Sequence, residues 1–272
     1  MKSLYDRLRA MFRPLSTALA MALLTGALPQ TAASEWYVAG YGGASFPFTL
    51  NPVQLNQLGE TLDTQLFSGG KNIPPVGSYS QTLHASDLSL KHSALFGARS
   101  GYFFTDQGFK WLGAEFEVFT TEPTIKEQTV RTVHDVTFNP FEPPEPPATC
   151  VPGTTCQIQR SIAGTVNIPK SSMRLIAFTF NAVVRYPGKV FQPYAGVGGG
   201  AFYFTSSGAI SGHQVVPGLN AFGGMKILVF EDWGVFVEGK FNRATITNFD
   251  RIYGLSGEYN AFNVLAGLAY HF

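Results

Sequence analysis

The sequence predicts an all-β fold, an eight-stranded antiparallel up-and-down β-barrel that spans a membrane. Three observations lead to this prediction: the pattern of the C-terminal segment, the pattern of the N-terminal segment, and a regular alternation of short and long connections between apolar stretches. Composition agrees, because only 14% of the residues are charged, well below the ~25% typical of soluble domains. Such a chain fits a lipid-facing barrel better than a secreted β-sandwich, whose outer face should be polar.

The C-terminal segment alternates with a period of two. Its apolar positions are Val264, Ala266, Leu268, Tyr270 and Phe272, and most residues between them are small or polar. In a strand this pattern places one apolar row on a single face. A soluble domain would leave that row as an aggregation-prone edge. A closed barrel in a bilayer covers the row with lipid and pairs the edge.

Residues 1–33 have the layout of a secretory signal peptide that is cleaved. Four basic residues open the chain, an apolar run covers 15–28, and small residues precede an expected cut after Ala33. The alternative is a membrane anchor that stays attached. The apolar run is too short, and too diluted by Thr25 and Gly26, to span a bilayer well. We therefore expect residues 34–272 to form the outer-membrane barrel domain.

Eight segments of alternating pattern follow, and turn-forming residues separate them. We expect strands at about 35–46, 92–104, 109–121, 173–186, 192–205, 219–230, 233–246 and 258–272. Each is long enough for a tilted crossing, which needs roughly 9–11 residues. The connections after the second, fourth and sixth strands are short. The others are expected to be long surface loops at about 47–91, 122–172, 206–218 and 247–257. This asymmetry, with an even strand number, is typical of outer-membrane barrels that have short periplasmic turns.

Two of these loops have a distinctive sequence. Leucines and a valine recur at near-helical spacing within 51–67, so this stretch is either a short surface helix or a disordered loop. Prolines crowd residues 141–147 and favour an extended backbone, which suits a stiff, protease-resistant loop better than a partner-recognition segment.

Cys150 and Cys156 are the two cysteines of the chain. An even pair in an exported protein indicates a disulfide, and the short turn-forming stretch between them makes bridging sterically easy. We expect a bridge that staples one loop. A redox pair or half of a metal site are the rival interpretations, but the spacing and the lack of nearby histidine ligands disfavour both.

The same alternation directs a second set of side chains into the lumen. Charged residues of both signs occupy these inward positions: Arg99, Glu115, Glu117, Arg185, Lys226, Glu238 and Lys240. Eight strands enclose a space that side chains can fill, and buried charges need partners. We therefore expect a network of ion pairs that plugs the lumen. A narrow gated ion path, or a catalytic carboxylate, is the alternative.

The sequence offers no catalytic, cofactor-binding or metal-binding motif. The glycine run at 198–200 continues into an aromatic strand segment and lacks the helix that a phosphate loop requires. The pairs or single residues His84, Ser86, Asp87, His134, Asp135, His213 and His271 contain suitable residue types, but close neighbours in sequence rarely form a triad. We therefore expect that the protein is not an enzyme. The net charge of +1 also disfavours nucleic acid as a partner.

Several segments resemble the OmpA-like outer-membrane β-barrel family. Residues 36–44 are similar to its opening strand, 193–201 to its fifth strand, and 236–241 to a lumen strand near its end. Tyr270 and Phe272 resemble the C-terminal signal read by the outer-membrane assembly machinery. The resemblance implies the cell outer membrane as location, with its lipids and lipopolysaccharide as partners, and a structural or surface-interaction role, possible host partners included, through the long loops. A narrow ion or small-solute channel and a lipid-modifying barrel enzyme remain alternatives.

Overall fold

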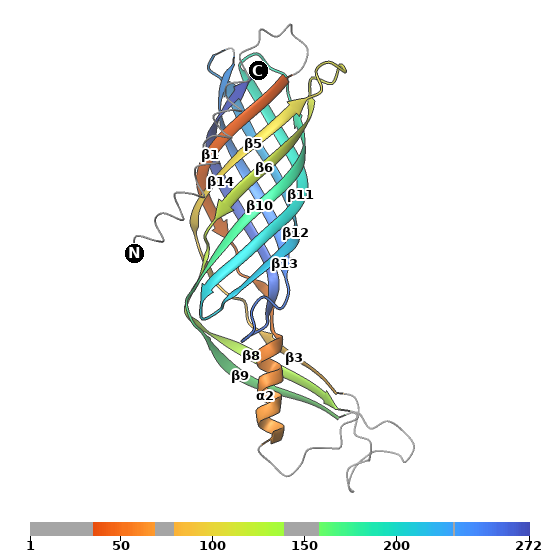
Figure 1. Ribbon diagram of the computed structural model, residues 1–272, viewed down its shortest axis with the longest axis vertical. Coiled ribbons are helices and arrows are strands. Elements are labelled where there is room, and N and C mark those ends of the chain that lie inside the picture. The colour runs from red at the N-terminus through yellow and green to blue at the C-terminus, as the bar shows by residue number, and fades with distance from the viewer. Residues whose placement is uncertain (1–34, 69–78, 139–157, 231) are drawn as a thin grey trace, which may run out of the picture.

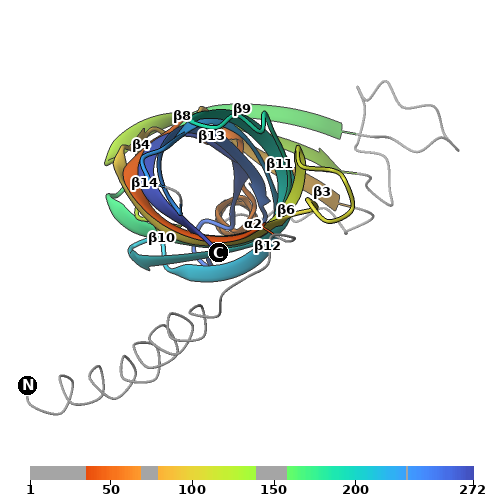
Figure 2. The same cartoon turned by 90° about the horizontal axis from the view of Figure 1, so that it is seen from above.

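A closed antiparallel β-barrel forms the main body of the computed structural model, which describes residues 35–68, 79–138, 158–230 and 232–272 (Figures 1 and 2). Each barrel strand pairs with its neighbours in chain order, and the last strand pairs with the first. The barrel strands are β1 (Glu35–Pro47), β5 (Ser93–Phe103), β6 (Leu112–Thr121), β10 (Ser171–Arg185), β11 (Phe191–Gly208), β12 (Gly212–Leu228), β13 (Trp233–Ile246) and β14 (Leu255–His271). The predicted eight-stranded antiparallel up-and-down barrel is confirmed.

The barrel closes along β1 and β14, whose continuous register runs from Tyr37 opposite His271 to Pro47 opposite Ala261. Alternate residues of each strand face outward and inward, as the period of two requires. The predicted outward row of β1, from Trp36 to Phe46, is more exposed than the inward residues between its members. We call the end of the barrel that holds Glu35 and His271 the terminal end, and the opposite end the loop end.

The sheet of the barrel continues beyond the loop end, away from the barrel (Figure 1). It leaves the barrel through β14, and its strands follow in the order β2, β3, β8 and β9. We call these four strands the outer sheet; their bounds are β2 (Asn51–Leu55), β3 (Tyr79–Ala85), β8 (Gln128–Phe138) and β9 (Ile158–Ile168). The short strands β4 (Leu90–Lys91) and β7 (Thr124–Ile125) pair with each other, and β7 also pairs with β10.

The helix α2 (Asn56–Ser68) packs beside the outer sheet and is the one helix of the described residues. The two interpretations of residues 51–67 are thereby resolved: the helical spacing is realised from Asn56 onward, whereas residues 51–55 form β2. These first residues pair with β14 and β3, so sheet hydrogen bonding fixes them as a strand.

The prediction of a long loop at 206–218 is wrong. Strand β11 runs to Gly208, β12 begins at Gly212, and the two pair from Phe191 opposite Ile227 to Ser206 opposite Gly212. Most of this stretch lies in strand ends, where small or polar residues pair as well as apolar ones. The fourth loop is also shorter than expected, because β14 begins at Leu255.

Several sequence predictions lie outside the described residues. They are the signal peptide at 1–33, the Cys150–Cys156 disulfide and the proline-rich segment 141–147. These remain predictions. No helix among the described residues is long and apolar enough to cross a membrane.

Candidate functional site

The interior of the barrel is the part of the molecule with concentrated charge chemistry. All seven predicted lumen residues are buried, with 0–6% of their surface exposed: Arg99, Glu115, Glu117, Arg185, Lys226, Glu238 and Lys240. They come from β5, β6, β10, β12 and β13, so strands on different sides of the barrel contribute. The contacts divide these residues into two groups.

Arg99 lies at the centre of the first group. Its Nη1 atom donates to Glu238 Oε2 at 2.7 Å and lies 3.4 Å from Glu115 Oε2. Its guanidinium carbon is 4.8 Å from the ring centroids of both Tyr41 and Phe236. Arginine favours such a setting, because its planar head pairs with carboxylates while its faces stack on rings.

Lys240 extends this group toward the loop end. Its ammonium forms an ion pair with Glu117 and lies 3.6 Å from Glu238 Oε1. Glu117 also accepts a hydrogen bond from the Tyr41 hydroxyl. Because Glu238 faces both Arg99 and Lys240, the ion pairs form one connected network across the barrel.

Neutral donors add hydrogen bonds to two of the carboxylates. Glu115 accepts from the Asn181 amide at 2.9 Å and from the Tyr37 hydroxyl at 2.5 Å. The Tyr194 hydroxyl donates to Glu238 at 2.8 Å. Buried carboxylates need such additional partners, since pairing alone seldom offsets their desolvation.

The second group lies at the terminal end and departs from the expected set. Arg185 donates to Glu35 Oε1 at 2.5 Å through Nη1 and to the Lys110 carbonyl at 3.1 Å through Nε. His271 Nδ1 lies 2.6 Å from the same Glu35 oxygen, and Lys226 Nζ lies 3.1 Å from His271 Nε2. Arg185 and Lys226 thus contact partners outside the predicted seven.

Sequence reasoning missed Glu35 and His271, although a signal for both was present. Each has the same parity as an inward residue of its own strand, and Tyr37 pairs directly with His271 across the barrel closure. Extending the inward row to the strand ends would have found them. Tyr37, Tyr41 and Tyr194 have the inward parity as well.

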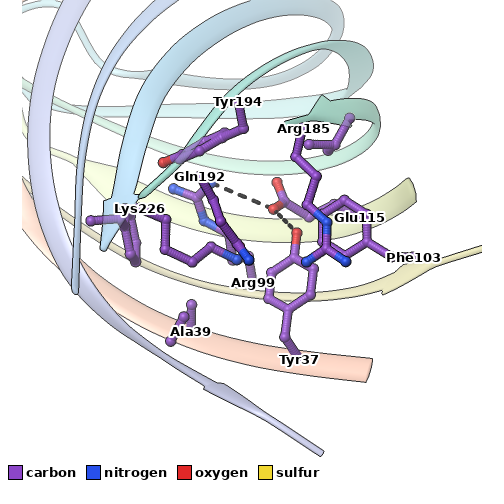
Figure 3. Close-up of a pocket in the computed structure, with 12 residues that line it drawn as sticks. Tyr37, Ala39, Arg99, Phe103, Glu115, Arg185, Gln192, Tyr194 and Lys226 are labelled. Atoms are coloured by element: carbon purple, nitrogen blue, oxygen red, sulfur yellow. Dashed lines mark hydrogen bonds and ion pairs between the residues drawn. The ribbon is translucent and has the colours of Figure 1, made fainter. Parts of the chain in front are cut away.

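A small cavity separates the two groups (Figure 3). Arg99 and Glu115 line it from the first group, and Arg185 and Lys226 from the second. Aromatic rings close its sides, with the Arg185 guanidinium 3.6 Å from the Phe103 ring centroid and Lys226 Nζ 4.8 Å from that of Tyr37. The cavity is therefore lined by charged side chains and aromatic rings.

Glycines make room for the large residues of this lumen. A Cβ atom at Gly97 would lie 2.3 Å from the Tyr41 hydroxyl oxygen, and one at Gly196 would lie 2.4 Å from the Phe222 ring. This agrees with the expectation that glycines in these strands relieve crowding from neighbouring side chains.

Toward the loop end the lumen changes character and becomes apolar. Phe119 and Phe202 meet edge to face at 6.0 Å, and Phe204 and Tyr259 do so at 5.3 Å. Leu175 and the other side chains at this level are 0–2% exposed. We call this level the apolar segment, with members Leu95, Phe119, Met173, Leu175, Phe202, Phe204 and Tyr259. We call the ionised level, both groups together, the charged segment.

The other residues considered for catalysis lie in or beside the outer sheet or on the barrel exterior. Ser86 Oγ accepts from the Arg131 amide, Asp87 accepts from Thr49, and Asp135 accepts from Ser161. His84 and His134 lie on β3 and β8. No group of three potential metal ligands occurs in the described part of the chain.

No protein-family model matches the chain, and no curated protein matches its sequence. Solved structures that it resembles include Neisserial surface protein A, with 10% identity, 89% of this chain and 100% of that chain covered, and a TM-score of 0.42. OprG of Pseudomonas aeruginosa has 13% identity, coverage of 88% and 96%, and a TM-score of 0.43. Ail of Yersinia pestis has 10% identity, coverage of 89% and 100%, and a TM-score of 0.40. The barrel assignment rests on the strand pairing, and membership of the OmpA-like family remains a prediction.

Proposed function

We propose that this protein is an outer-membrane β-barrel with a closed lumen, and that it holds the outer sheet at the cell surface for interaction with other molecules. The observation that carries the proposal is an apolar band around the barrel exterior. A soluble barrel would expose charged and polar residues there, whereas a bilayer requires an apolar surface.

The height of the band is consistent on several strands. On β13 the outward positions from Trp233 to Phe241 are apolar or glycine, and the next outward residue is Arg243. On β10 the outward row from Val184 to Ile176 is apolar, and the next is Arg174. Each row covers about nine residues, which at a tilt of 35–45° matches an apolar band of roughly 25 Å.

The band contains large, exposed side chains. Phe180 is 71% exposed, Leu219 66% and Val197 62%. Within the described barrel strands, charged outward residues occur only near the loop end. Arg174 and Arg243 border the band there, at the depth where phosphates of lipopolysaccharide would contact the barrel.

The orientation follows from the two ends. The connections β5–β6, β10–β11 and β12–β13 lie at the terminal end with Glu35 and His271, and the outer sheet extends from the loop end (Figure 1). Outer-membrane barrels place short turns in the periplasm, so the outer sheet would face the exterior. Tyr270 and Phe272, at the end of β14, would serve as the signal for the assembly machinery.

The interior favours an anchor over a channel. The charged segment pairs its carboxylates with cations. The apolar segment, on its loop-end side, is nearly inaccessible to solvent. An ion crossing the barrel would have to break buried ion pairs and then pass a dry apolar level. We therefore propose that the lumen supports the fold and that the external face carries the function.

The test compares electrophoretic mobility of the outer-membrane fraction before and after boiling in detergent. A folded barrel resists the detergent and shifts its apparent size only after heating. The protein with Leu265→Pro, which breaks the closing strand inside the lumen wall, is the unfolded control. Recovery of the native protein in the soluble periplasm without a heat-dependent shift would contradict the proposal. Planar-bilayer recordings of the folded protein should show no steady conductance, and a reproducible conductance would support the channel alternative.

A further inference from the structure

Strand β9 is a free edge of the outer sheet. It pairs with β8 through all eleven positions from Ile158 to Ile168, and no described strand pairs with its other side. Alternate backbone N–H and C=O groups of β9 therefore point away from the sheet. Residues 161–165 are all exposed, so these backbone groups are accessible.

The edge lacks the features that usually protect a strand from further pairing. Natural edges carry lysines, prolines or bulges, or lie under a helix. The sequence of β9 contains one charged residue, Arg160, and no proline. Its register with β8 has no shift.

Helix α2 packs mainly against β3, which lies two strands away from β9 in the outer sheet. Leu58 and Leu62 of α2 pack against the apolar core, and the Gln81 amide of β3 donates to the Asn56 carbonyl at the start of α2. On β8 the face that contains Val130 is buried, and Val130 itself is 2% exposed. On β9 the same face remains open, with Ile162 48% exposed.

We propose that the β9 edge binds an extended peptide segment of a partner molecule by strand addition. A row of backbone donors and acceptors is complementary to another extended backbone, and alternating side chains then give specificity. The face of β9 that carries Ile162 and Val166 is apolar except for Arg160 near its start, and the other face is uncharged and includes Ser161 and Thr165. The segment it selects would alternate apolar and uncharged polar residues.

A second copy in the same membrane is the less suitable occupant. Two copies in one bilayer are related by an axis along the barrel, whereas antiparallel pairing of two β9 strands needs an axis perpendicular to them. Strands β8 and β9 run obliquely to the long axis of the barrel (Figure 1). A symmetry axis along the barrel is therefore not perpendicular to β9, so it cannot bring the β9 edges of two neighbouring copies into antiparallel pairing. The inference rests on the proposed function, because the edge must face the cell exterior.

The test uses the folded full-length mature protein in detergent and a fluorescent peptide with the β8 sequence, residues 128–138, in which serine replaces the charged residues Arg131 and Asp135. This segment already pairs with β9 over its full length, so its alternation suits the free edge. We expect saturable binding by fluorescence polarisation and slower amide hydrogen exchange within 158–168. Ile162→Lys should weaken binding about tenfold, because a charge on an edge strand opposes pairing. The matched control Val133→Lys, on the interior strand β8 and similarly exposed, should bind within about twofold of the native protein.

Two N-methylated peptides separate strand addition from hydrophobic adhesion. One is methylated at the odd-numbered positions and the other at the even-numbered positions. In an antiparallel pair alternate N–H groups face the neighbour, so one peptide should lose binding and the other should keep it. Equal binding by both, or no exchange protection in 158–168, would overturn the inference. Protection of 158–168 by the protein alone, with a doubled mass, would assign the edge to a second copy and also overturn it. A heat-dependent mobility shift without peptide binding would remove only this inference and leave the barrel proposal intact.

Discussion

The two segments of the lumen are filled by opposite kinds of chemistry. In the charged segment Arg99 and Lys240 form ion pairs with three glutamates. In the apolar segment Phe202, Leu175 and their neighbours exclude water by packing. Burial is similar in both segments, since Lys240 and Phe202 are each 0% exposed.

The two segments should respond differently to the substitution of a side chain. A buried charge depends on a specific partner, so removing one member leaves the other uncompensated. An apolar side chain depends on volume, so its loss costs transfer and cavity free energy that several neighbours share. The charged segment should therefore be sensitive to single changes and tolerant of paired ones, while the apolar segment should show additive losses.

The largest effect is expected for Glu117→Ala. This change leaves the Lys240 ammonium buried without its closest carboxylate, and should lower the free energy of unfolding by about 3–5 kcal/mol. Urea unfolding in lipid vesicles, followed by tryptophan fluorescence, measures it. The double variant Glu117→Leu/Lys240→Met should recover most of the loss. If the double variant is as unstable as the single one, the charges are not the cause.

Leu175→Ala should give the next largest loss, about 3 kcal/mol, because it opens a cavity in the apolar segment. Val184→Ala, on the outward face of the same strand β10 and 45% exposed, is the matched control and should cost far less. The same unfolding measurement compares the two. Similar losses at both positions would mean that the apolar segment is not tightly packed.

Conductance distinguishes which segment closes the barrel. We expect the double variant Glu117→Ala/Lys240→Ala to remain non-conducting in planar bilayers, because an apolar constriction excludes ions by dewetting. The triple variant Leu175→Ser/Phe202→Ser/Phe204→Ser keeps the ion pairs but removes the apolar constriction. Its conductance therefore measures how far the apolar segment closes the barrel. Conductance in the double variant would show that the ion pairs alone form the plug.

The strands and their faces could be predicted from the sequence because alternation is a local property. The outward rows on β1, β10 and β13 follow from the period of two, and the ends of β13 match the predicted bounds. The apolar segment was missed, although the inward parity of Arg185 on β10 leads directly to Leu175.

Contacts across the barrel could not be predicted from local pattern. Arg99 and Glu238 are 139 residues apart, and their meeting depends on the register and tilt of every strand between them. The outer sheet was missed for a similar reason, because β3 and β8 pair across a sequence separation that contains two barrel strands. Sequence placed both strands in loops, since neither meets lipid and neither must span the bilayer.

The smallest effect is expected for the exposed ion pair at the loop end. Arg174 and Glu122 form a salt bridge on the barrel exterior, and their side chains are 54% and 53% exposed. Solvent screens such pairs, so Arg174→Ala should change the free energy of unfolding by about 0–1 kcal/mol in detergent. In vesicles that contain lipopolysaccharide the loss should be larger than in detergent, because Arg174 borders the apolar band at the depth of the lipid phosphates. Unfolding in the two media compares them, and Glu122→Gln serves as the control that leaves the cation in place. An equal effect of Arg174→Ala in both media would remove Arg174 as a lipid contact while leaving the contrast between buried and exposed pairs unchanged.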